Sequence, residues 1–266
     1  MINQYAKRTA LCECTGSAFI ASDTARVEFF WPGSAPRGGQ FFLIKPDSAG
    51  VFLGRPISAA GWKPGADGNS GAGERGGVLS FIIASRGRGS RELVQLKPGD
   101  KAELIGPLGK GWEEACKFYN VPYGNAALVA GGVGIAPLLL LIQEMGERPF
   151  DLYAGFRTGS FGLEDIKSGN LIIATEDGSL GKKGRITDFF TPSAYNVVFA
   201  CGPEPMLRVV SQRCKAETVP CFVSMEKHMA CGVGACLGCT VKTVSGNRRC
   251  CADGPVFNAA ELCYDE

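Results

Sequence analysis

The spacing of the cysteines near the C-terminus constrains this chain more than any other feature. Twelve of its 266 residues are cysteine, and five of these fall between positions 231 and 251. Cys231, Cys236 and Cys239 form the pattern C-x4-C-x2-C, and Cys250 and Cys251 follow eleven and twelve residues later. This is the plant-type ferredoxin spacing for a 2Fe–2S cluster, in which four thiolates surround two irons. The spacing predicts such a cluster, with Cys250 and Cys251 as competing candidates for the fourth ligand.

The loop that carries the first three cysteines is rich in glycine. Gly232, Gly234 and Gly238 allow the backbone to wrap tightly, because glycine tolerates positive φ and close approach. The alternative is a structural zinc site, but zinc sites usually pair C-x2-C with a second such pair or with two histidines. The x4 gap and the glycines therefore favour the cluster. The other seven cysteines are scattered, and we predict no function for them because buried cysteine commonly acts as a small apolar side chain.

Composition excludes several other classes of protein. The N-terminus lacks the apolar core of a secretory signal, so metal binding is favoured over disulfides and a cytoplasmic location is expected. A net charge of +2 gives no indication of nucleic acid or an anionic membrane as the main partner. The longest apolar run, at residues 136–142, is too short to span a bilayer. His228 is the only histidine, and we interpret it as an ordinary polar residue, which argues against Ser–His–Asp hydrolysis.

Three structural units are predicted along the chain. Residues 1–112 contain short apolar strands separated by Gly/Pro turns, which indicates a small antiparallel barrel. Within them, the Gly-rich residues 63–77 have almost nothing apolar to bury and predict a flexible hairpin tip. In residues 113–222, apolar strands alternate with helical segments, which is typical of a parallel sheet covered by helices. Residues 223–266 form a cysteine-rich module. The fold class is therefore α+β and multidomain.

Two turns of the second unit are candidates for binding a dinucleotide. One lies directly between a predicted strand at 126–130 and a helix, where free amides can hold a pyrophosphate. The other ends a strand at the same edge of the sheet. Each is also compatible with a plain turn, and the sequence leaves that alternative open. The candidate residues are Gly131, Gly132, Gly134, Cys201, Gly202 and Pro203.

The first unit carries two candidate phosphate-binding motifs. In Arg55-Pro56-Ile57-Ser58, the arginine offers a fork for a phosphate oxygen and the serine adds a hydroxyl. Gly89-Ser90 precedes a helical segment and could form a second phosphate cap. Alone, each motif is a weak signal.

Taken in order, these motifs resemble the ferredoxin reductase superfamily, in which an FAD-binding barrel precedes a nicotinamide-binding α/β domain. The tail from Glu226 to Cys239, with Cys251-Ala-Asp-Gly-Pro-Val-Phe257, resembles the electron-transfer subunit of NAD-linked (type B) dihydroorotate dehydrogenase. The resemblance implies that Cys251 is the fourth ligand, leaving Cys250 spare. The implied cluster ligands are Cys231, Cys236, Cys239 and Cys251. The implied FAD residues are Arg55, Pro56, Ile57, Ser58, Ile82, Ile83, Ala84, Gly89 and Ser90.

The resemblance also implies a function and a partner. Electrons would pass from dihydroorotate and FMN in a separate catalytic subunit through the 2Fe–2S cluster and FAD to NAD⁺, in pyrimidine biosynthesis. A heterotetramer with two copies of each subunit is expected, and no catalytic acid or base is assigned to this chain. The chain departs from the family pattern at Ala84, Ser90 and the long 63–77 segment, which could alter flavin contacts.

Several alternatives stay open. The same cofactors could serve a ferredoxin-linked transhydrogenase, a sulfur reductase or a hydrogenase. More remote alternatives are a non-redox zinc module and a regulatory iron–sulfur sensor. Arg157 would suit the 2′-phosphate of NADPH, whereas the family resemblance implies NAD.

Overall fold

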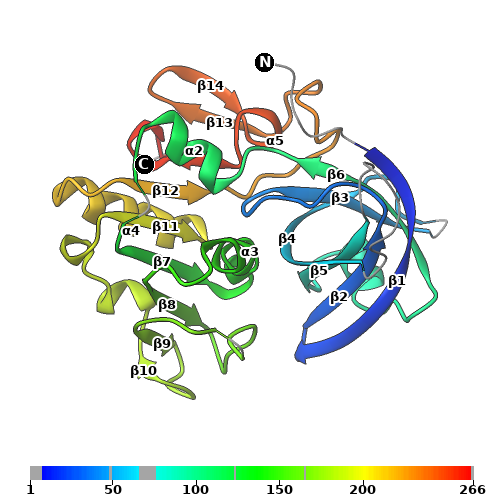
Figure 1. Ribbon diagram of the computed structural model, residues 1–266, viewed down its shortest axis with the longest axis horizontal. Coiled ribbons are helices and arrows are strands. Elements are labelled where there is room, and N and C mark those ends of the chain that lie inside the picture. The colour runs from blue at the N-terminus through cyan, green and yellow to red at the C-terminus, as the bar shows by residue number, and fades with distance from the viewer. Residues whose placement is uncertain (1–7, 48–49, 66–75, 123, 165, 265–266) are drawn as a thin grey trace.

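The computed structural model describes residues 8–47, 50–65, 76–122, 124–164 and 166–264. Its N-terminal part is a closed antiparallel barrel with the strand order β1-β2-β5-β4-β3-β6 (Figure 1). The elements are β1 (Arg8–Ala21), β2 (Thr24–Trp31), β3 (Phe41–Pro46), β4 (Arg55–Pro64), β5 (Gly77–Ala84), α1 (Arg88–Leu93) and β6 (Lys101–Leu108). The predicted barrel is confirmed. β4 begins with the Arg55–Ser58 motif itself, and most of the predicted hairpin tip, residues 66–75, lies outside the described residues.

Aromatic side chains fill the barrel because alternate residues of its strands point inward. Trp31 and Phe42 pack edge to face with ring centroids 5.0 Å apart, and Phe42 and Phe81 do so at 5.6 Å. All three are fully buried. Edge-to-face packing of this kind adds to the stability gained from burial, so these rings stabilise the interior of the barrel.

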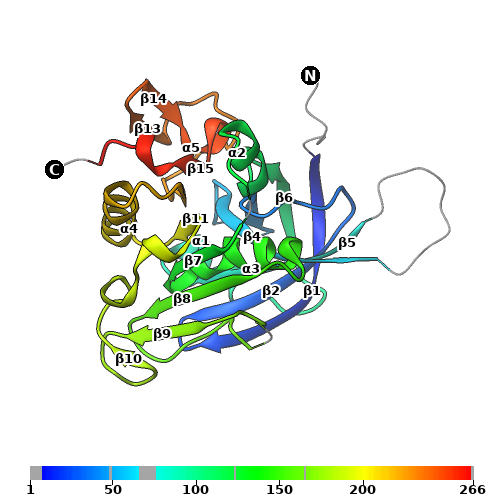
Figure 2. The same ribbon diagram turned by 60° about the vertical axis from the view of Figure 1, so that its left-hand side comes forward.

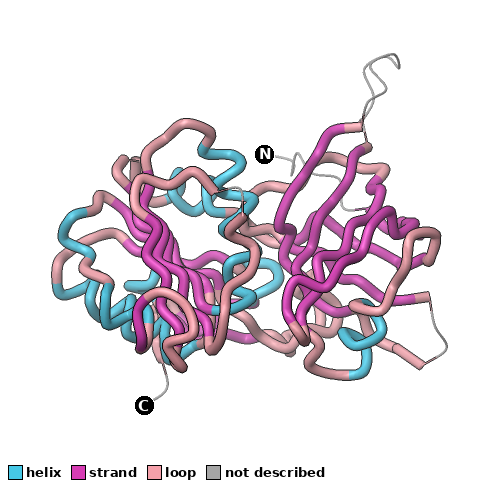
Figure 3. Tube along the Cα trace, turned by 90° about the horizontal axis from the view of Figure 1, so that it is seen from below, coloured by secondary structure: helices cyan, strands magenta, loops and turns pink. Residues whose placement is uncertain are grey.

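The second part is a seven-stranded sheet with the order β10-β9-β8-β7-β11-β12-β15. All neighbouring pairs are parallel except β12 with β15. The predicted parallel sheet is confirmed, and Figure 3 shows it beside the barrel. Its elements are α2 (Trp112–Phe118), β7 (Ala126–Gly131), η1 (Gly132–Ile135), α3 (Ala136–Met145), β8 (Phe150–Phe156), β9 (Leu171–Thr175), β10 (Lys182–Lys183), η2 (Ile186–Phe189), η3 (Pro192–Ala194), β11 (Val197–Cys201), α4 (Glu204–Ala216) and β12 (Cys221–Ser224).

Helices cover both faces of this sheet, as the buried central strands require. Every residue of β7 and of β11 is buried. α3 lies between the sheet and the barrel, and α4 covers the opposite face (Figure 1). Two contacts attach α3 to its neighbours: the Gln143 side chain bonds the backbone of Trp62 in β4, and the Trp112 indole donates to the Pro137 carbonyl at 3.1 Å.

The C-terminal module contains the hairpin β13 (Thr240–Thr243) and β14 (Gly246–Arg249), then α5 (Cys250–Asp253), β15 (Val256–Asn258) and η4 (Ala259–Glu261). Figure 2 shows the hairpin and α5 grouped beside α2. β15 pairs with β12, so this module completes the edge of the sheet. The domain limits at 112 and 222 stay predictions, and β12 extends across the second of them. No helix in the described ranges has the length and apolar character to cross a membrane.

Candidate cofactor sites

Four cysteines of the C-terminal module come together as two pairs. The amide of Cys236 donates to Sγ of Cys231 at 3.4 Å, and the amide of Cys251 donates to Sγ of Cys239 at 3.4 Å. The thiols within each pair also share a hydrogen bond. Among the described residues, no three His, Cys, Asp or Glu side chains converge as ligands of one metal ion. Two thiolate pairs with amides directed at sulfur are a suitable donor set for a binuclear iron–sulfur cluster.

The cluster loop, which we define as residues 231–239, wraps against the barrel. Gly232 has φ +67°, and a Cβ on it would lie 2.7 Å from Cδ1 of Leu43 in β3. A side chain at this position would both strain the backbone and collide with the barrel. The glycine therefore lets the loop approach β3 closely.

Cys250 and Cys251 differ in the direction of their thiols. The Cys250 thiol donates to the buried carbonyl of Met225 at 3.1 Å, whereas Cys251 faces Cys239. The turn of α5 is fixed by Arg249, whose Nε and Nη2 bond the Asp253 carboxylate at 2.9 and 3.1 Å. Bidentate pairs of this kind restrict orientation as well as adding energy. The geometry therefore favours Cys251 as the fourth ligand.

Cys231 should be the most reactive of the four thiols when the cluster is absent. Hydrogen bonds, first from the Val233 amide and then from the Cys236 amide, lower the pKa of Cys231 to about 6. Because the thiolate is the reactive form, alkylation of iron-free protein by iodoacetamide should rise with pH, with a midpoint near pH 6, and then level off. A reference thiol such as glutathione has a pKa near 8.5 and should still be only about 3% ionised at pH 7.

Mass spectrometry after brief labelling across a pH series measures this directly. The cluster-containing protein is the control, because its Cys231 should resist labelling. A labelling midpoint for Cys231 above pH 8 in the iron-free protein would contradict the hydrogen-bonded geometry.

The arginine of the barrel motif has an unsatisfied donor. Nε of Arg55 is buried and lacks a hydrogen-bond partner in the described structure. It lies against the first turn of α1, where a Cβ on Gly89 would be only 2.4 Å away. The first helical bond runs from the Arg91 amide to the Gly87 carbonyl, so the preceding amides are at the open end of the helix. A buried guanidinium donor beside helix amides fits a phosphate group, as FAD would provide.

Ser90 belongs to the predicted phosphate cap, but its hydroxyl bonds within the chain. That hydroxyl accepts the amides of Arg86 and Gly87 at 2.9 and 3.0 Å and donates to the Gly87 carbonyl at 3.1 Å. It therefore caps α1 internally. Its amide, rather than its hydroxyl, is the group that remains for a phosphate.

The predicted flavin strand, β5, divides its residues between two environments. Ile83 packs in the barrel interior with Phe81, so only its backbone can face a flavin. Ile82 lies on the outer face in a cluster with Ile135 of η1, and Ala84 is also nearly buried. On β4, Pro56 and Ser58 are half-buried and Ile57 packs toward the barrel core.

The two predicted nucleotide turns meet at one point of the sheet. β7 and β11 are parallel neighbours, and Ala130 pairs with Cys201 at their ends. The sheet order changes direction between these strands, which makes this the topological switch point where α/β sheets bind ligands. A Cβ on Gly134 would lie 2.3 Å from the Cys201 carbonyl oxygen. Because the two turns lie this close together, position 134 has no room for a Cβ and requires glycine.

Leu43 connects the cluster loop to the flavin motif. Its side chain contacts Gly232, and its Cβ is 3.0 Å from the Cβ position of Gly54, the residue before Arg55. On the opposite side of the flavin motif, Ile82 packs toward the nicotinamide turn. The predicted flavin site therefore lies between the cluster loop and the dinucleotide turns.

Glu226 also belongs to this region, although the sequence did not identify it as a site residue. Burial raises the pKa of Glu226, and the charge of Arg86 opposes that effect. Burial, and then the charge of Glu226, raise the pKa of Cys201. Glu226 follows β12, whose last residue, Ser224, pairs with Cys201 at the end of β11. The feature that could have identified Glu226 from the sequence is its position just after β12, at the same edge of the sheet as Cys201.

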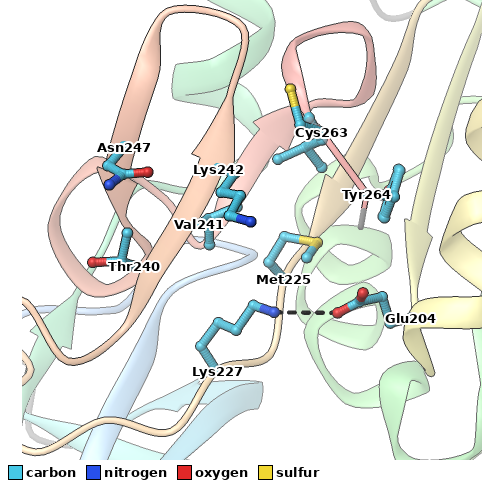
Figure 4. Close-up of a pocket in the computed structure, with 10 residues that line it drawn as sticks. Glu204, Met225, Lys227, Thr240, Val241, Lys242, Asn247, Cys263 and Tyr264 are labelled. Carbon is cyan, nitrogen blue, oxygen red and sulfur yellow. Dashed lines mark hydrogen bonds and ion pairs between the residues drawn. The ribbon is translucent and has the colours of Figure 1, made fainter. Parts of the chain in front are cut away.

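A separate cavity of about 290 Å³ opens between α4 and the C-terminal module (Figure 4). Lys227 and Glu204 form an ion pair across it, with Nζ and Oε2 3.2 Å apart. Met225 separates it from Cys250. None of the predicted cofactor residues lines this cavity.

Comparison with known proteins gives a consistent result. Residues 226–263 match the iron–sulfur cluster binding domain of dihydroorotate dehydrogenase B. The dihydroorotate dehydrogenase B (NAD(+)) electron transfer subunit of Clostridium acetobutylicum is 40% identical over 234 residues, covering 86% of this chain and 87% of that protein. The corresponding protein of Clostridium perfringens is 41% identical over 230 residues, covering 84% and 86%.

Solved structures extend the similarity to the whole fold. The structure of an NADH-dependent reduced ferredoxin-NADP oxidoreductase, studied for flavin-based electron bifurcation, is similar with a TM-score of 0.78 and 27% identity, covering 96% of this chain and 90% of that one. The ferredoxin reductase of carbazole 1,9a-dioxygenase gives a TM-score of 0.65 at 20% identity, covering 82% of this chain and 68% of that one, and supports the fold alone.

Proposed function

This chain belongs to the family of dihydroorotate dehydrogenase B electron transfer subunits, and we propose that it carries electrons from dihydroorotate oxidation to NAD⁺ in pyrimidine biosynthesis. The observation that supports this most strongly is the position of the flavin motif between the cluster loop and the dinucleotide turns. FAD, a 2Fe–2S cluster and NAD are the redox groups of this function. The electron source is a separate catalytic subunit, which contains FMN, in an assembly with two copies of each chain.

The residues of this chain bind and orient these groups. When bound, the cluster exchanges single electrons, the nicotinamide exchanges a hydride, and FAD can do both. The two cysteine pairs hold the cluster, with Cys251 as its fourth protein ligand. Arg55 and the amides of α1 would hold the FAD phosphates, and Ile82 packs beside Ile135 of η1 on the outer face of the barrel. No acid–base catalyst is assigned to this chain, because dihydroorotate oxidation takes place on the partner.

Apolar side chains around the cluster loop suit the binding of that partner. Phe52 is 91% exposed and Leu237 is 61% exposed, and Leu53 and Val233 are exposed as well. Phe52 and Leu53 precede Gly54, and Val233 follows Gly232, so these three side chains adjoin the two glycines that lie against Leu43. Exposed apolar groups gathered at one place mark a protein interface. Docking there brings the partner's electron donor close to the cluster.

Leu237 is the residue whose replacement should separate partner binding from cofactor binding. Its φ is +58°, a conformation that is costly for leucine but tolerated by asparagine. Leu237→Asn should therefore leave the cluster in place and slightly raise the free energy of unfolding. It should also weaken binding of the catalytic subunit about tenfold or more, because burying a leucine side chain contributes about 1.5–3 kcal/mol.

Calorimetric titration of the catalytic subunit measures this affinity. Val244→Asn is the matched control, since Val244 is 71% exposed on the β13–β14 turn, outside the cluster loop. Equal affinities for the wild type and Leu237→Asn would rule out this docking surface.

The decisive test of the function is reconstitution with the FMN-containing catalytic subunit. The complex should form NADH when supplied with dihydroorotate and NAD⁺, and neither subunit alone should do so. The similarity to the NADH-dependent ferredoxin-NADP oxidoreductase makes ferredoxin-linked transhydrogenation the second candidate. Activity with reduced ferredoxin, combined with none from dihydroorotate, would favour that candidate instead.

A further inference from the structure

A cation from the C-terminal module lies directly against the cluster loop, residues 231–239, which carries no charged side chain of its own. A Cβ on Gly234 would lie 3.3 Å from Nη1 and 3.5 Å from Cδ of Arg249. Gly234 has φ +85°, and its amide bonds the sulfur of Cys251. The guanidinium therefore lies against the residue that donates to the fourth ligand of the proposed cluster.

The Asp253 carboxylate holds Arg249 in this position. Nε of Arg249 donates to Oδ2 at 2.9 Å and Nη2 donates to Oδ1 at 3.1 Å. The Arg249 amide also donates to Oδ2, at 2.8 Å. A bidentate pair of this kind keeps the planar guanidinium in one orientation. Nε and Nη2 are thus bound to Asp253, and Nη1 is the nitrogen that faces Gly234.

The charges of the cysteines reach this guanidinium. The bonds and the charge of Asp253 are the largest causes that raise the pKa of Arg249, and the charges of Cys251 and Cys239 follow. The side chain of Arg249 is 42% exposed, so water screens part of its field. Reduction adds negative charge to an iron–sulfur cluster, and a cation nearby stabilises that added charge. Arg249 is placed to favour the reduced form.

We propose that the charge of Arg249 raises the reduction potential of the cluster, and that Asp253, which orients it, opposes this effect. This rests on the proposed function, in which the two cysteine pairs hold a 2Fe–2S cluster. Net charge around a cluster is one of the factors that set its potential. A higher potential makes the cluster a better acceptor of electrons from the catalytic partner.

The sign of two shifts separates this charge effect from a purely structural role of the ion pair. Arg249→Gln and Asp253→Asn both break the pair, so a structural role alone predicts that both disturb the cluster in the same direction. The charge effect predicts opposite directions. Arg249→Gln should lower the midpoint potential by about 59 mV, which is tenfold in the equilibrium constant for one-electron transfer. Asp253→Asn should raise it.

Spectroelectrochemical titration of the full chain, loaded with FAD and the cluster, measures these potentials from the cluster absorption bands. Arg249→Lys keeps the positive charge and should retain most of the wild-type potential. Arg248→Gln is the matched control, because Arg248 is the adjacent arginine of β14 and its Nη2 lies 3.4 Å from Oγ of Ser245. Neighbouring residues of a strand point to opposite faces, so this variant should leave the potential unchanged.

Shifts of the same sign in Arg249→Gln and Asp253→Asn would overturn the proposal, as would an unchanged potential in an Arg249→Gln protein that keeps its iron. If Arg249→Gln loses its iron, Asp253→Asn decides: a higher potential supports the proposal, and an unchanged or lower one contradicts it. Loss of iron from both variants would assign the pair a structural role only and would also overturn the proposal.

Failure of the proposed function has a different signature. In that case the potentials shift as described, yet dihydroorotate, NAD⁺ and the catalytic subunit give no NADH.

Discussion

Replacing Cys251 with serine should abolish electron transfer between this chain and its catalytic partner. Cys251 faces Cys239, and its amide donates to the Cys239 sulfur at 3.4 Å. A serine hydroxyl is a much weaker ligand than a thiolate for an iron–sulfur cluster, so the purified variant should contain little iron and sulfide. Dihydroorotate-dependent NADH formation by the complex should fall at least about 100-fold, because no other single-electron carrier connects the two flavins.

Cys250→Ser is the matched control for this prediction. The Cys250 thiol donates to the Met225 carbonyl, and a serine hydroxyl can make the same bond. Cys250→Ser should therefore keep its iron content and its activity. In Cys251→Ser, reduction of FAD by NADH should persist, since the dinucleotide turns are unaltered. Loss of iron in Cys250→Ser, with retention in Cys251→Ser, would reverse the ligand assignment.

Replacing Arg55 with alanine should have the largest effect on the flavin. Nε of Arg55 is buried without a partner in the described structure, and the side chain lies against Gly89 at the start of α1. Charge-assisted hydrogen bonds contribute about 1.5–3 kcal/mol each. Losing a pair of them should weaken FAD binding roughly 100-fold or more. Fluorescence titration of the flavin-free protein with FAD measures this affinity.

Arg91→Ala is the control for Arg55→Ala, because Arg91 is an exposed residue of the same helix. It should bind FAD as the wild type does. Arg55→Ala should also leave the iron content unchanged, since Arg55 lies on β4 and not in the cluster loop. An unchanged FAD affinity in Arg55→Ala would mean that the phosphates bind elsewhere.

The features that could be predicted from the sequence are those encoded by local patterns. The C-x4-C-x2-C spacing and its glycines indicated the cluster loop because its ligands lie within one short segment. The runs of buried residues in β7 and β11 indicated a parallel sheet, because such strands are covered on both faces. The Gly131–Gly134 turn was recognisable for the same reason, since it lies directly between a strand and a helix.

The features that could not be predicted depend on contacts between distant segments. β15 pairs with β12 across more than thirty residues of chain, and no local pattern indicates that register. The inward direction of Ile83 and the internal bonds of the Ser90 hydroxyl depend on how β5 and α1 pack. The spacing alone left the choice between Cys250 and Cys251 open, and only the family resemblance implied Cys251; the bond of the Cys250 thiol to the Met225 carbonyl comes from another strand end.

The measurement that tests the central claim most directly is an anaerobic visible absorption spectrum of the purified chain, taken before and after NADH is added. The account predicts flavin and ferric-cluster bands that both bleach, because the dinucleotide turns, the flavin motif and the cluster loop lie in succession along the molecule. A protein that stays colourless after reconstitution with FAD, iron and sulfide would contradict it. So would flavin and cluster bands that NADH leaves unchanged.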